Sequence, residues 1–205
     1  MKNSDQIPIG CVILAAGNST RFGRNKLFTE INGKTMIVRA FASVPAEKLR
    51  GVVVVTQYED VRRLAESFGF FSIVNSHPEW GLSHSVRLGT EALKDQCGGI
   101  LYQVADQPWL KRESVCGMLD VFCEHPDSIV AMSSNGKRGN PCIFPKAFFD
   151  ELCALSGDKG GRAVIEHHED RLLLFEVSAE ELADIDTPED IDNINEELGM
   201  RNEES

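Results

Sequence analysis

Hydrophobic positions along this chain alternate between two spacings. Short runs rich in Val, Ile and Leu are typical of buried β-strands, and they lie at residues 9–14, 52–56, 71–74, 100–104, 129–132 and 172–177. Longer segments repeat apolar side chains three and four positions apart, which predicts helices with one core-facing side, and they lie at residues 35–43, 60–68, 82–93, 114–124, 147–155 and 188–198. This alternation predicts an α/β fold with a mostly parallel sheet and helices on both of its faces.

Local signals mark turns and helix ends. Asn32-Gly33 is the pair that most strongly favours a hairpin turn. Although residues 33–35 resemble the end of a Walker loop, Phe28 stands where that loop requires glycine. Thr187 is expected to cap the last helix. No repeat, low-complexity tract or linker divides the chain, so we expect one domain over residues 1–205 with its core at 9–198.

The composition is that of an ordinary globular protein, with 42% hydrophobic and 26% charged residues. The 32 acidic and 21 basic residues give a formal net charge of −11, which argues against binding to nucleic acid or to an anionic membrane. Any anionic ligand must therefore be held by a local cluster of positive groups or by a metal.

Two further features concern the cellular compartment. The first apolar stretch, residues 9–16, is too short to span a bilayer and lacks the basic leader of a signal peptide, so we expect a cytoplasmic protein. The six cysteines include no Cys-x-x-Cys pair and no histidine at zinc-finger spacing. Reduced and mostly buried thiols are therefore expected.

A loop of small and basic residues, LAAGNSTRFGRNK, follows the first predicted strand at residues 14–26. In an open α/β sheet, ligands bind beyond the carboxyl ends of the strands. Small residues let backbone amides approach phosphate oxygens, and Arg21 and Lys26 supply the charge that triphosphate binding and pyrophosphate departure need. A flexible turn with two solvated cations is the alternative. The phosphate-binding interpretation involves Leu14, Ala15, Ala16, Gly17, Ser19, Arg21 and Lys26.

The same loop resembles the signature of the MobA-like nucleotidyltransferases, which join a nucleoside monophosphate to a phosphate-bearing acceptor. Guanylyltransferases of that family typically have Leu-Ala-Gly-Gly, whereas the molybdenum cofactor cytidylyltransferases have Leu-Ala-Ala-Gly, so Ala16 implies CTP as the donor. The resemblance extends over residues 9–198. It implies a single Rossmann-like domain of the nucleotide-diphospho-sugar transferase type.

The resemblance also implies a Mg²⁺ site. Asp106 opens an Asp-Gln-Pro motif after the strand predicted at 100–104, and magnesium prefers carboxylates together with substrate phosphates. The later Asp-Ile-Asp-Thr-Pro stretch is similar to the family motif that completes this site. Asp186 is the expected second ligand and Asp184 the less favoured one. Aspartates that only cap turns are the alternative.

Residues 75–85 resemble the family segment in which a glycine and serines precede a helix and contact the base and ribose. The N-terminus of that helix also favours anionic groups. The residues concerned are Gly81, Ser83 and Ser85. The family pattern does not require His77 or His84, which we expect to be surface or hydrogen-bonded side chains rather than metal ligands. His167 and His168 are expected to be exposed.

Two later stretches are similar to parts of the cytidylyltransferase subgroup and imply an acceptor site. They read Arg-Gly-Asn-Pro at 138–141 and Gly-Asp-Lys-Gly-Gly-Arg at 157–162. Glycines at a helix start suit an anion pocket, although an ordinary surface turn has the same composition. The candidate acceptor-binding residues are Asn140, Pro141, Asp158, Lys159, Gly160 and Arg162.

The resemblance implies transfer of CMP from CTP to the phosphate of molybdopterin, with or without bound molybdenum, and release of pyrophosphate. Asp106 and Asp186 would hold Mg²⁺, and Arg21 and Lys26 would stabilise the leaving pyrophosphate. The product would serve an apo molybdenum hydroxylase such as xanthine dehydrogenase in purine catabolism. Two alternatives stay open: a nucleotidyltransferase for a sugar or polyol phosphate, and a non-catalytic carrier that delivers the molybdenum cofactor.

Overall fold

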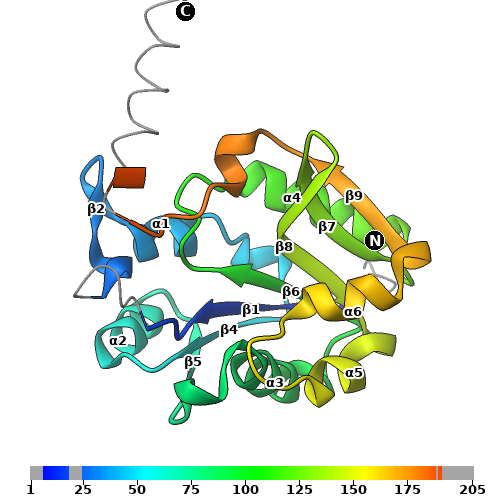
Figure 1. Ribbon diagram of the computed structural model, residues 1–205, viewed down its shortest axis with the longest axis horizontal. Coiled ribbons are helices and arrows are strands. Elements are labelled where there is room, and N and C mark those ends of the chain that lie inside the picture. The colour runs from blue at the N-terminus through cyan, green and yellow to red at the C-terminus, as the bar shows by residue number, and fades with distance from the viewer. Residues whose placement is uncertain (1–6, 19–24, 188, 191–205) are drawn as a thin grey trace, which may run out of the picture.

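The computed structural model describes residues 7–18, 25–187 and 189–190. They fold around a seven-stranded sheet with strand order β5-β4-β1-β6-β8-β7-β9 (Figure 1). The strands are β1 (Ile9–Ala15), β4 (Gly51–Thr56), β5 (Phe71–Val74), β6 (Gly99–Val104), β7 (Ile129–Ser134), β8 (Lys137–Pro145) and β9 (Leu172–Glu176). All neighbours run parallel except at β8, which is antiparallel to both β6 and β7. The structure confirms the mostly parallel sheet.

Helices cover both faces of the sheet, as the hydrophobic pattern predicts. One face carries α1 (Met36–Ala42), α2 (Glu59–Ser67) and α4 (Arg112–Glu124); the other carries α3 (Leu82–Leu93), α5 (Phe149–Ala154) and α6 (Gly161–His167). Figure 1 shows α3, α5 and α6 together below the sheet. Short 3-10 turns connect several of these elements, at Lys26–Phe28, Ala46–Lys48, Pro78–Trp80, Lys146–Phe148, Glu169–Arg171 and Ala179–Leu182.

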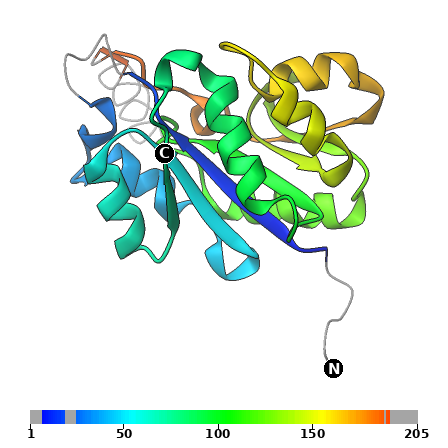
Figure 2. The same cartoon turned by 90° about the horizontal axis from the view of Figure 1, so that it is seen from below.

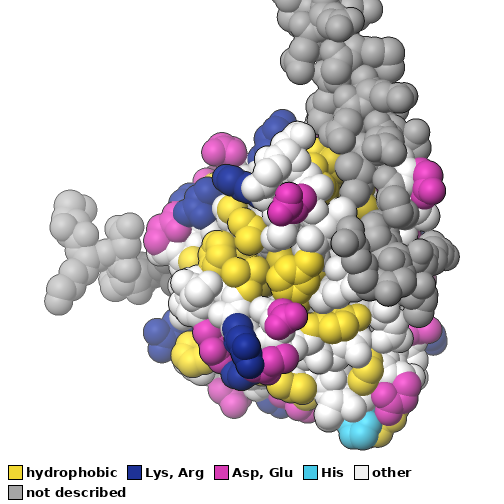
Figure 3. Space-filling view, turned by 90° about the vertical axis from the view of Figure 1, so that its left-hand side faces the viewer, with side chains coloured by type: hydrophobic (Ala, Val, Ile, Leu, Met, Phe, Trp, Pro, Cys, Tyr) yellow, Lys and Arg dark blue, Asp and Glu magenta, His cyan; other side chains and the backbone are white. Residues whose placement is uncertain are grey.

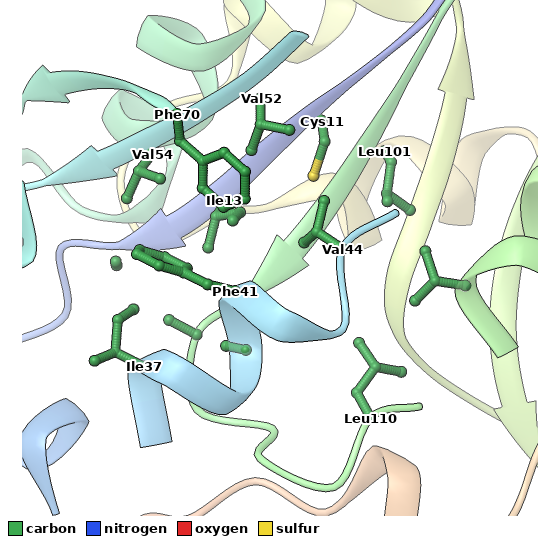
Figure 4. Packing of buried hydrophobic residues seen from close by; sticks show 14 of the residues in the cluster. Cys11, Ile13, Ile37, Phe41, Val44, Val52, Val54, Phe70, Leu101 and Leu110 are labelled. Carbon is green, nitrogen blue, oxygen red and sulfur yellow. The ribbon is translucent and has the colours of Figure 1, made fainter. Parts of the chain in front are cut away.

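The two helical layers bury two apolar clusters, because successive side chains of a strand point to opposite faces. In β1, Cys11 and Ile13 belong to the cluster under α1, whereas Val12 belongs to the cluster under α3. Phe41 of α1 lies among the residues of the first cluster (Figure 4), and its ring meets that of Phe70 edge to face at a centroid distance of 5.4 Å. Burial of a side chain of this size stabilises the fold by roughly 1.5–3 kcal/mol.

A small hairpin precedes α1, as Asn32-Gly33 predicts. It consists of β2 (Glu30–Ile31) and β3 (Lys34–Thr35), which pair antiparallel. Both turn residues have positive φ, 48° at Asn32 and 75° at Gly33, as a two-residue hairpin turn requires. The hairpin prediction is therefore confirmed.

Two elements differ from the sequence expectations, and a third lies almost wholly outside the described residues. β8 has no counterpart among the predicted strands because its first half is charged and small and contains Pro141, which is disfavoured inside strands. The helix predicted at 147–155 begins as a 3-10 turn, and its α-helical part spans only Phe149–Ala154. The helix predicted at 188–198 lies outside the described residues except for residues 189–190. No described helix is long and apolar enough to cross a membrane.

The parallel strands β5, β4, β1 and β6 all end at one edge of the sheet, as the views in Figures 1 and 2 show. The segments that follow them therefore meet at this edge, where an open α/β sheet binds its ligands. We refer to it as the carboxyl edge.

Candidate active site

A pocket of about 290 Å³ opens at the carboxyl edge. Its walls come from the loop after β1, the start of α3, the segment after β6 and the loop between α5 and α6. Nine of the predicted site residues line it, namely Leu14, Ala15, Ala16, Gly17, Lys26, Gly81, Ser85, Asp106 and Asp158. Figure 3 views the molecule from this side, where acidic and basic side chains are mixed among hydrophobic ones. Two further predicted residues, Ser19 and Arg21, lie outside the described residues.

The loop after β1 is held by the neighbouring strand. Gln57, which follows β4, donates from Nε2 to the Ala16 carbonyl at 2.7 Å and to Asn18 Oδ1 at 2.9 Å. The Tyr58 hydroxyl donates to the Gly17 carbonyl at 2.7 Å. These bonds fix three carbonyl and amide oxygens of a small-residue loop. The sequence analysis missed Gln57 and Tyr58, although their position directly after a parallel strand is the signal that could have found them.

A glycine shapes the opposite wall of the pocket. Gly81 has φ 83°, a conformation that favours glycine. A Cβ at this position would lie 2.5 Å from the carbonyl group of Gly157 and 2.6 Å from Oδ1 of Asp158. The Ser83 N–H donates to the Gly157 carbonyl at 3.1 Å. The N-terminus of α3 is thus joined closely to the loop that brings Asp158 to the pocket.

The predicted serines of this segment differ in position. Ser85 lines the pocket and accepts a hydrogen bond of 3.0 Å from the buried Asn75 side chain. Asn75 follows β5 and also accepts from the His77 N–H at 2.9 Å. Ser83 is buried, and its backbone joins α3 to the 157–162 loop. Nucleotide contacts by Ser83 and Ser85 stay predictions.

The two aspartates expected to bind metal meet at one cation, the ammonium of Lys26. Lys26 Nζ lies 2.9 Å from Asp106 Oδ2 and 3.0 Å from Asp186 Oδ1. It also donates to the Ile185 carbonyl at 2.8 Å. Burial alone would lower the pKa of Lys26, but the negative charges and hydrogen bonds of Asp106 and Asp186 outweigh that effect and raise it. Residues far apart in sequence are thereby brought together around one charge.

Backbone contacts hold Asp186 in this place. The Ile185 N–H donates to the Asp106 carbonyl at 3.0 Å. The Asp190 carboxylate accepts from the N–H groups of Asp186 at 2.8 Å and of Thr187 at 2.6 Å, and the Asp190 N–H donates to the Thr187 carbonyl at 3.2 Å. The Asp190 side chain supplies the half of a capping box that reaches back to the backbone N–H groups before a helix. Residues 189–190 are helical, as expected after Thr187, whereas a cap by the Thr187 side chain stays a prediction.

Asp184 lies apart from the Lys26 ion pairs. It borders a second, open pocket together with Gln107, on the side of β8. The pKa of Asp184 is raised to about 6, first because its surroundings desolvate the carboxylate and then because Asp106 and Asp186 place negative charge nearby. Among the described aspartates, Asp106 and Asp186 share the ammonium of Lys26, and the preference for Asp186 over Asp184 as a metal ligand stays a prediction.

The oxygens around Lys26 suit a divalent cation. Two carboxylates and the Ile185 carbonyl already surround one positive charge at hydrogen-bonding distance, and Mg²⁺ or Mn²⁺ selects such hard oxygen donors. Within residues 7–18, 25–187 and 189–190, no group of three or more His, Cys, Asp or Glu side chains is placed to hold a metal ion. A cation here would therefore complete its shell with water or with substrate phosphates.

The candidate acceptor residues separate into two groups. Asp158 lines the main pocket. Asn140, Gly160 and Arg162 line a smaller cavity of about 60 Å³, which adjoins the main pocket through Leu14, Leu82 and Val104. Pro141 follows Asn140 through a cis peptide bond in β8. Lys159 lies in the same loop as Asp158 but lines neither of these two cavities.

The structure shows the surroundings of the four histidines considered in the sequence, and it corrects one expectation. His77 stacks on Trp80 at a centroid distance of 4.2 Å. His84 is buried, which lowers its pKa, and its Nδ1 lies 2.9 Å from Arg87 Nη2. The expectation that His168 is exposed is wrong: it is half-buried against Phe148, and its Nε2 lies 2.8 Å from Glu151 Oε2. His167 is exposed as expected.

All six cysteines are free thiols. Cys11, Cys97 and Cys142 are buried and the other three are partly buried. Burial raises the pKa of Cys142 to about 12, so this thiol stays protonated although its residue borders the smaller cavity. The expectation of reduced, mostly buried thiols agrees with these free side chains, each of which is at least partly buried.

Comparison with known proteins decides the family. Residues 11–172 match the family model of the MobA-like NTP transferase domain. The chain belongs to this family. The match begins inside β1 and ends at the first residue of β9, so it includes the loop after β1, the start of α3 and Asp106.

Individual relatives agree with this assignment. The chain is 28% identical over 195 residues to the purine catabolism protein PucB of Bacillus subtilis, covering 89% of this chain and 94% of PucB. A shorter segment of 65 residues is 40% identical to a probable molybdenum cofactor guanylyltransferase of Thermococcus sibiricus, covering 31% of this chain and 33% of that protein. The fold is also that of Rv0371c from Mycobacterium tuberculosis, with a TM-score of 0.80 at 21% identity over 94% of this chain and 99% of that one. A second structure of that protein is a complex with manganese, with a TM-score of 0.73 at 21% identity over 92% of this chain and 98% of that one.

Proposed function

We propose that this member of a nucleotidyltransferase family transfers CMP from CTP to the terminal phosphate of molybdopterin, with release of pyrophosphate. The observation that carries the proposal is the meeting of Lys26, Asp106 and Asp186 beside a pocket lined by the small-residue loop. This arrangement places one cation and two carboxylates where phosphates can approach backbone amides. Phosphoryl transfer that is catalysed by positioning and charge stabilisation requires such an arrangement.

The chemistry needs no covalent enzyme intermediate. A phosphate oxygen of the acceptor attacks the α-phosphorus of CTP, a new phosphorus–oxygen bond forms, and the bond to the bridging oxygen of the β-phosphate breaks. Pyrophosphate leaves with the electron pair of that bond. Lys26 and the amides of the loop after β1 stabilise the charge that develops on the leaving group. Arg21 belongs to the same loop in sequence, and its contribution is part of the proposal.

Asp106 and Asp186 would hold the divalent cation, with the Ile185 carbonyl close by. When bound, Mg²⁺ would neutralise charge on the triphosphate. The manganese complex of the mycobacterial relative supports a divalent cation in this fold. Asp106 and Asp186 keep their positions through the contact between the Ile185 N–H and the Asp106 carbonyl, and through the Asp190 carboxylate.

The nucleotide and the acceptor are the finer part of the proposal. Ala16 lines the pocket at the position where the guanylyl form of the motif has glycine, and this match to the cytidylyl form of the motif supports CTP as the donor. The acceptor would bind toward the smaller cavity, near Asn140 and Arg162. A molybdopterin acceptor is supported by the names of two relatives, a purine catabolism protein and a probable molybdenum cofactor guanylyltransferase. The product would serve a cytoplasmic molybdenum hydroxylase such as xanthine dehydrogenase.

The deciding experiment measures pyrophosphate release from CTP and from GTP, with Mg²⁺ and molybdenum-loaded molybdopterin. We expect release from CTP by the wild type and a loss on the order of a hundredfold or more in Asp106→Ala, because one charge-stabilising group is removed. Asp60→Ala, the same change at an exposed residue of α2, should keep wild-type activity.

Three outcomes would change the proposal. Pyrophosphate release from GTP alone would mean that GTP and not CTP is the donor. Pyrophosphate release with a sugar or polyol phosphate, but not with molybdopterin, would mean that the acceptor is that phosphate. Binding of the cofactor without any release, by a folded protein, would support the carrier function instead.

A further inference from the structure

The Lys26 ammonium is fully engaged by the two carboxylates and one carbonyl. An ammonium group has three N–H donors, and the oxygens of Asp106, Ile185 and Asp186 lie 2.9, 2.8 and 3.0 Å from Nζ. Only 13% of the Lys26 side chain is exposed to solvent. The ammonium therefore sits between the carboxylates rather than at the surface of the cluster.

A divalent cation cannot bind Asp106 Oδ2 and Asp186 Oδ1 together while Lys26 contacts these two oxygens. Metal–oxygen distances for such ions are about 2.1 Å, so an ion that bridges the two oxygens would need the space that Nζ now fills. Two cations so close together would also repel each other strongly. Lys26 and the metal are thus alternative occupants of the same oxygens.

The local charge requires that one cation replaces the other. Three carboxylates, those of Asp106, Asp184 and Asp186, influence one another here, and in the described part of the chain the positive charge of Lys26 acts on all three. If Lys26 left alone, the three negative charges would lose this compensation in a partly buried site. The departure of Lys26 is therefore favourable only when a cation arrives at the carboxylates and an anion receives the ammonium.

The main pocket supplies a place for that anion. Lys26 itself lines it, together with Ala15, Ala16 and Gly17 of the small-residue loop. The flexible four-carbon stem of lysine can carry its ammonium from one partner to another. A triphosphate bound at the loop amides would present negative oxygens to Lys26 from the pocket side.

We propose that Lys26 is an exchangeable counter-ion, which occupies the oxygens of Asp106 and Asp186 in the free protein and leaves them for the phosphates of an arriving nucleotide. The divalent cation then gains these oxygens together with the nucleotide rather than before it. This inference rests on the proposed function only for the triphosphate nature of the ligand. Its central claim, that Lys26 excludes the metal from the free protein, can be tested without nucleotide.

The test measures binding of Mn²⁺ to the full chain in the absence of nucleotide, from the electron paramagnetic resonance signal of free Mn²⁺. The proteins are the wild type, Lys26→Met, which removes the ammonium at similar side-chain length, and Lys34→Met. Lys34 is an exposed lysine of β3, so its replacement is a control for the change in net charge. We expect Lys26→Met to bind Mn²⁺ at least about tenfold more tightly than the wild type, and Lys34→Met to match the wild type within about twofold.

A second arm uses the preformed complex of Mn²⁺ with α,β-methylene-CTP, which cannot undergo transfer. For each protein, the dissociation constant of free Mn²⁺ is divided by that of the Mn²⁺–nucleotide complex. This ratio should be at least about tenfold smaller in Lys26→Met than in the wild type, because the carboxylates of the variant are accessible to Mn²⁺ without the nucleotide. Calorimetry measures both constants.

Equal Mn²⁺ affinity of the wild type and Lys26→Met without nucleotide would overturn the proposal, as would an equal gain in Lys34→Met. If Lys26→Met does not fold, as circular dichroism would show, Lys26→Gln gives the same test because an amide is not a cation. Failure of the Mn²⁺–nucleotide complex to bind the wild type would contradict the proposed function, whereas the nucleotide-free titrations would still decide the role of Lys26.

Discussion

The two halves of the sheet build their parts of the site in different ways. In the parallel half, β5-β4-β1-β6, every strand is followed within two residues by a residue that shapes or lines the pocket: Asn75, Gln57, Ala16 and Asp106. In the other half, β8-β7-β9, the candidate residues lie within β8, in the loop before α6 and its first turn, and after the 3-10 turn at Ala179–Leu182. Parallel strands gather polar residues at one edge by topology alone, whereas the second half depends on tertiary contacts to bring its residues there.

The largest expected effect comes from disturbing the contact between the halves. Gly81→Ala would force an L-residue into positive φ and push its Cβ against the Gly157 carbonyl and Asp158. We expect the free energy of unfolding to fall by about 1–3 kcal/mol and the affinity for α,β-methylene-CTP to fall about tenfold or more. Urea unfolding and calorimetry measure the two effects.

Gly69→Ala is the matched control for this change. Gly69 has φ 75°, but no atom lies within 4 Å of a Cβ built there. The control therefore carries the backbone strain without the collision, and it should keep its nucleotide affinity. Equal affinity losses in both variants would show that backbone strain weakens nucleotide binding, and not the collision of the new Cβ with Gly157 and Asp158.

A smaller effect is expected within the parallel half. Gln57→Ala removes the hydrogen bonds that hold the Ala16 carbonyl and Asn18, and the loss of such bonds typically costs about 1 kcal/mol. We expect the affinity for α,β-methylene-CTP to fall about fivefold, while Gln96→Ala, at an exposed glutamine, has no effect. An unchanged affinity in Gln57→Ala would mean that the loop keeps its shape without the neighbouring strand.

The smallest effect belongs to the second half. Arg162 borders the smaller cavity, but its side chain is 81% exposed and pairs with Glu166, so it is well screened by water. Arg162→Ala should raise KM for molybdopterin about threefold and leave the dissociation constant of the CTP analogue unchanged. Glu166→Ala frees Arg162 from its pair and should not raise this KM. A change in nucleotide affinity instead would indicate that Arg162 contacts the donor nucleotide and not the acceptor.

Much of the parallel half could be predicted from the sequence because its signals are local. Alternating apolar runs give the strands β1, β4, β5 and β6 within two residues of their ends. The small-residue loop and Asp106 follow two of these strands immediately, so their convergence at one edge needs no knowledge of side-chain packing. The resemblance to the family then supplies the candidate roles.

The remaining features depend on contacts between distant residues. β8 contains Pro141 and polar residues, and it exists as a strand because β6 and β7 pair with it on both sides. Gln57 and Tyr58 act on a loop 41 positions away in sequence, which no periodicity reveals. The capture of Lys26 by two carboxylates also escaped prediction, because each residue alone suggests a contact with ligand rather than with the others.

The position of β1 in the strand order has a consequence for protein synthesis. β1 is formed by the first residues of the fold to leave the ribosome, yet it lies between β4 and β6. Its ladder with β4 can form once Thr56 has emerged, but its ladder with β6 stays incomplete until Val104, the last residue of β6, has left the exit tunnel. Pairing of this apolar strand with β6 is therefore delayed for about ninety residues of elongation, which take several seconds at bacterial or eukaryotic rates. During that interval the nascent chain exposes one edge of a strand that is almost wholly buried in the folded protein, and shielding by a ribosome-associated chaperone would matter most at this stage.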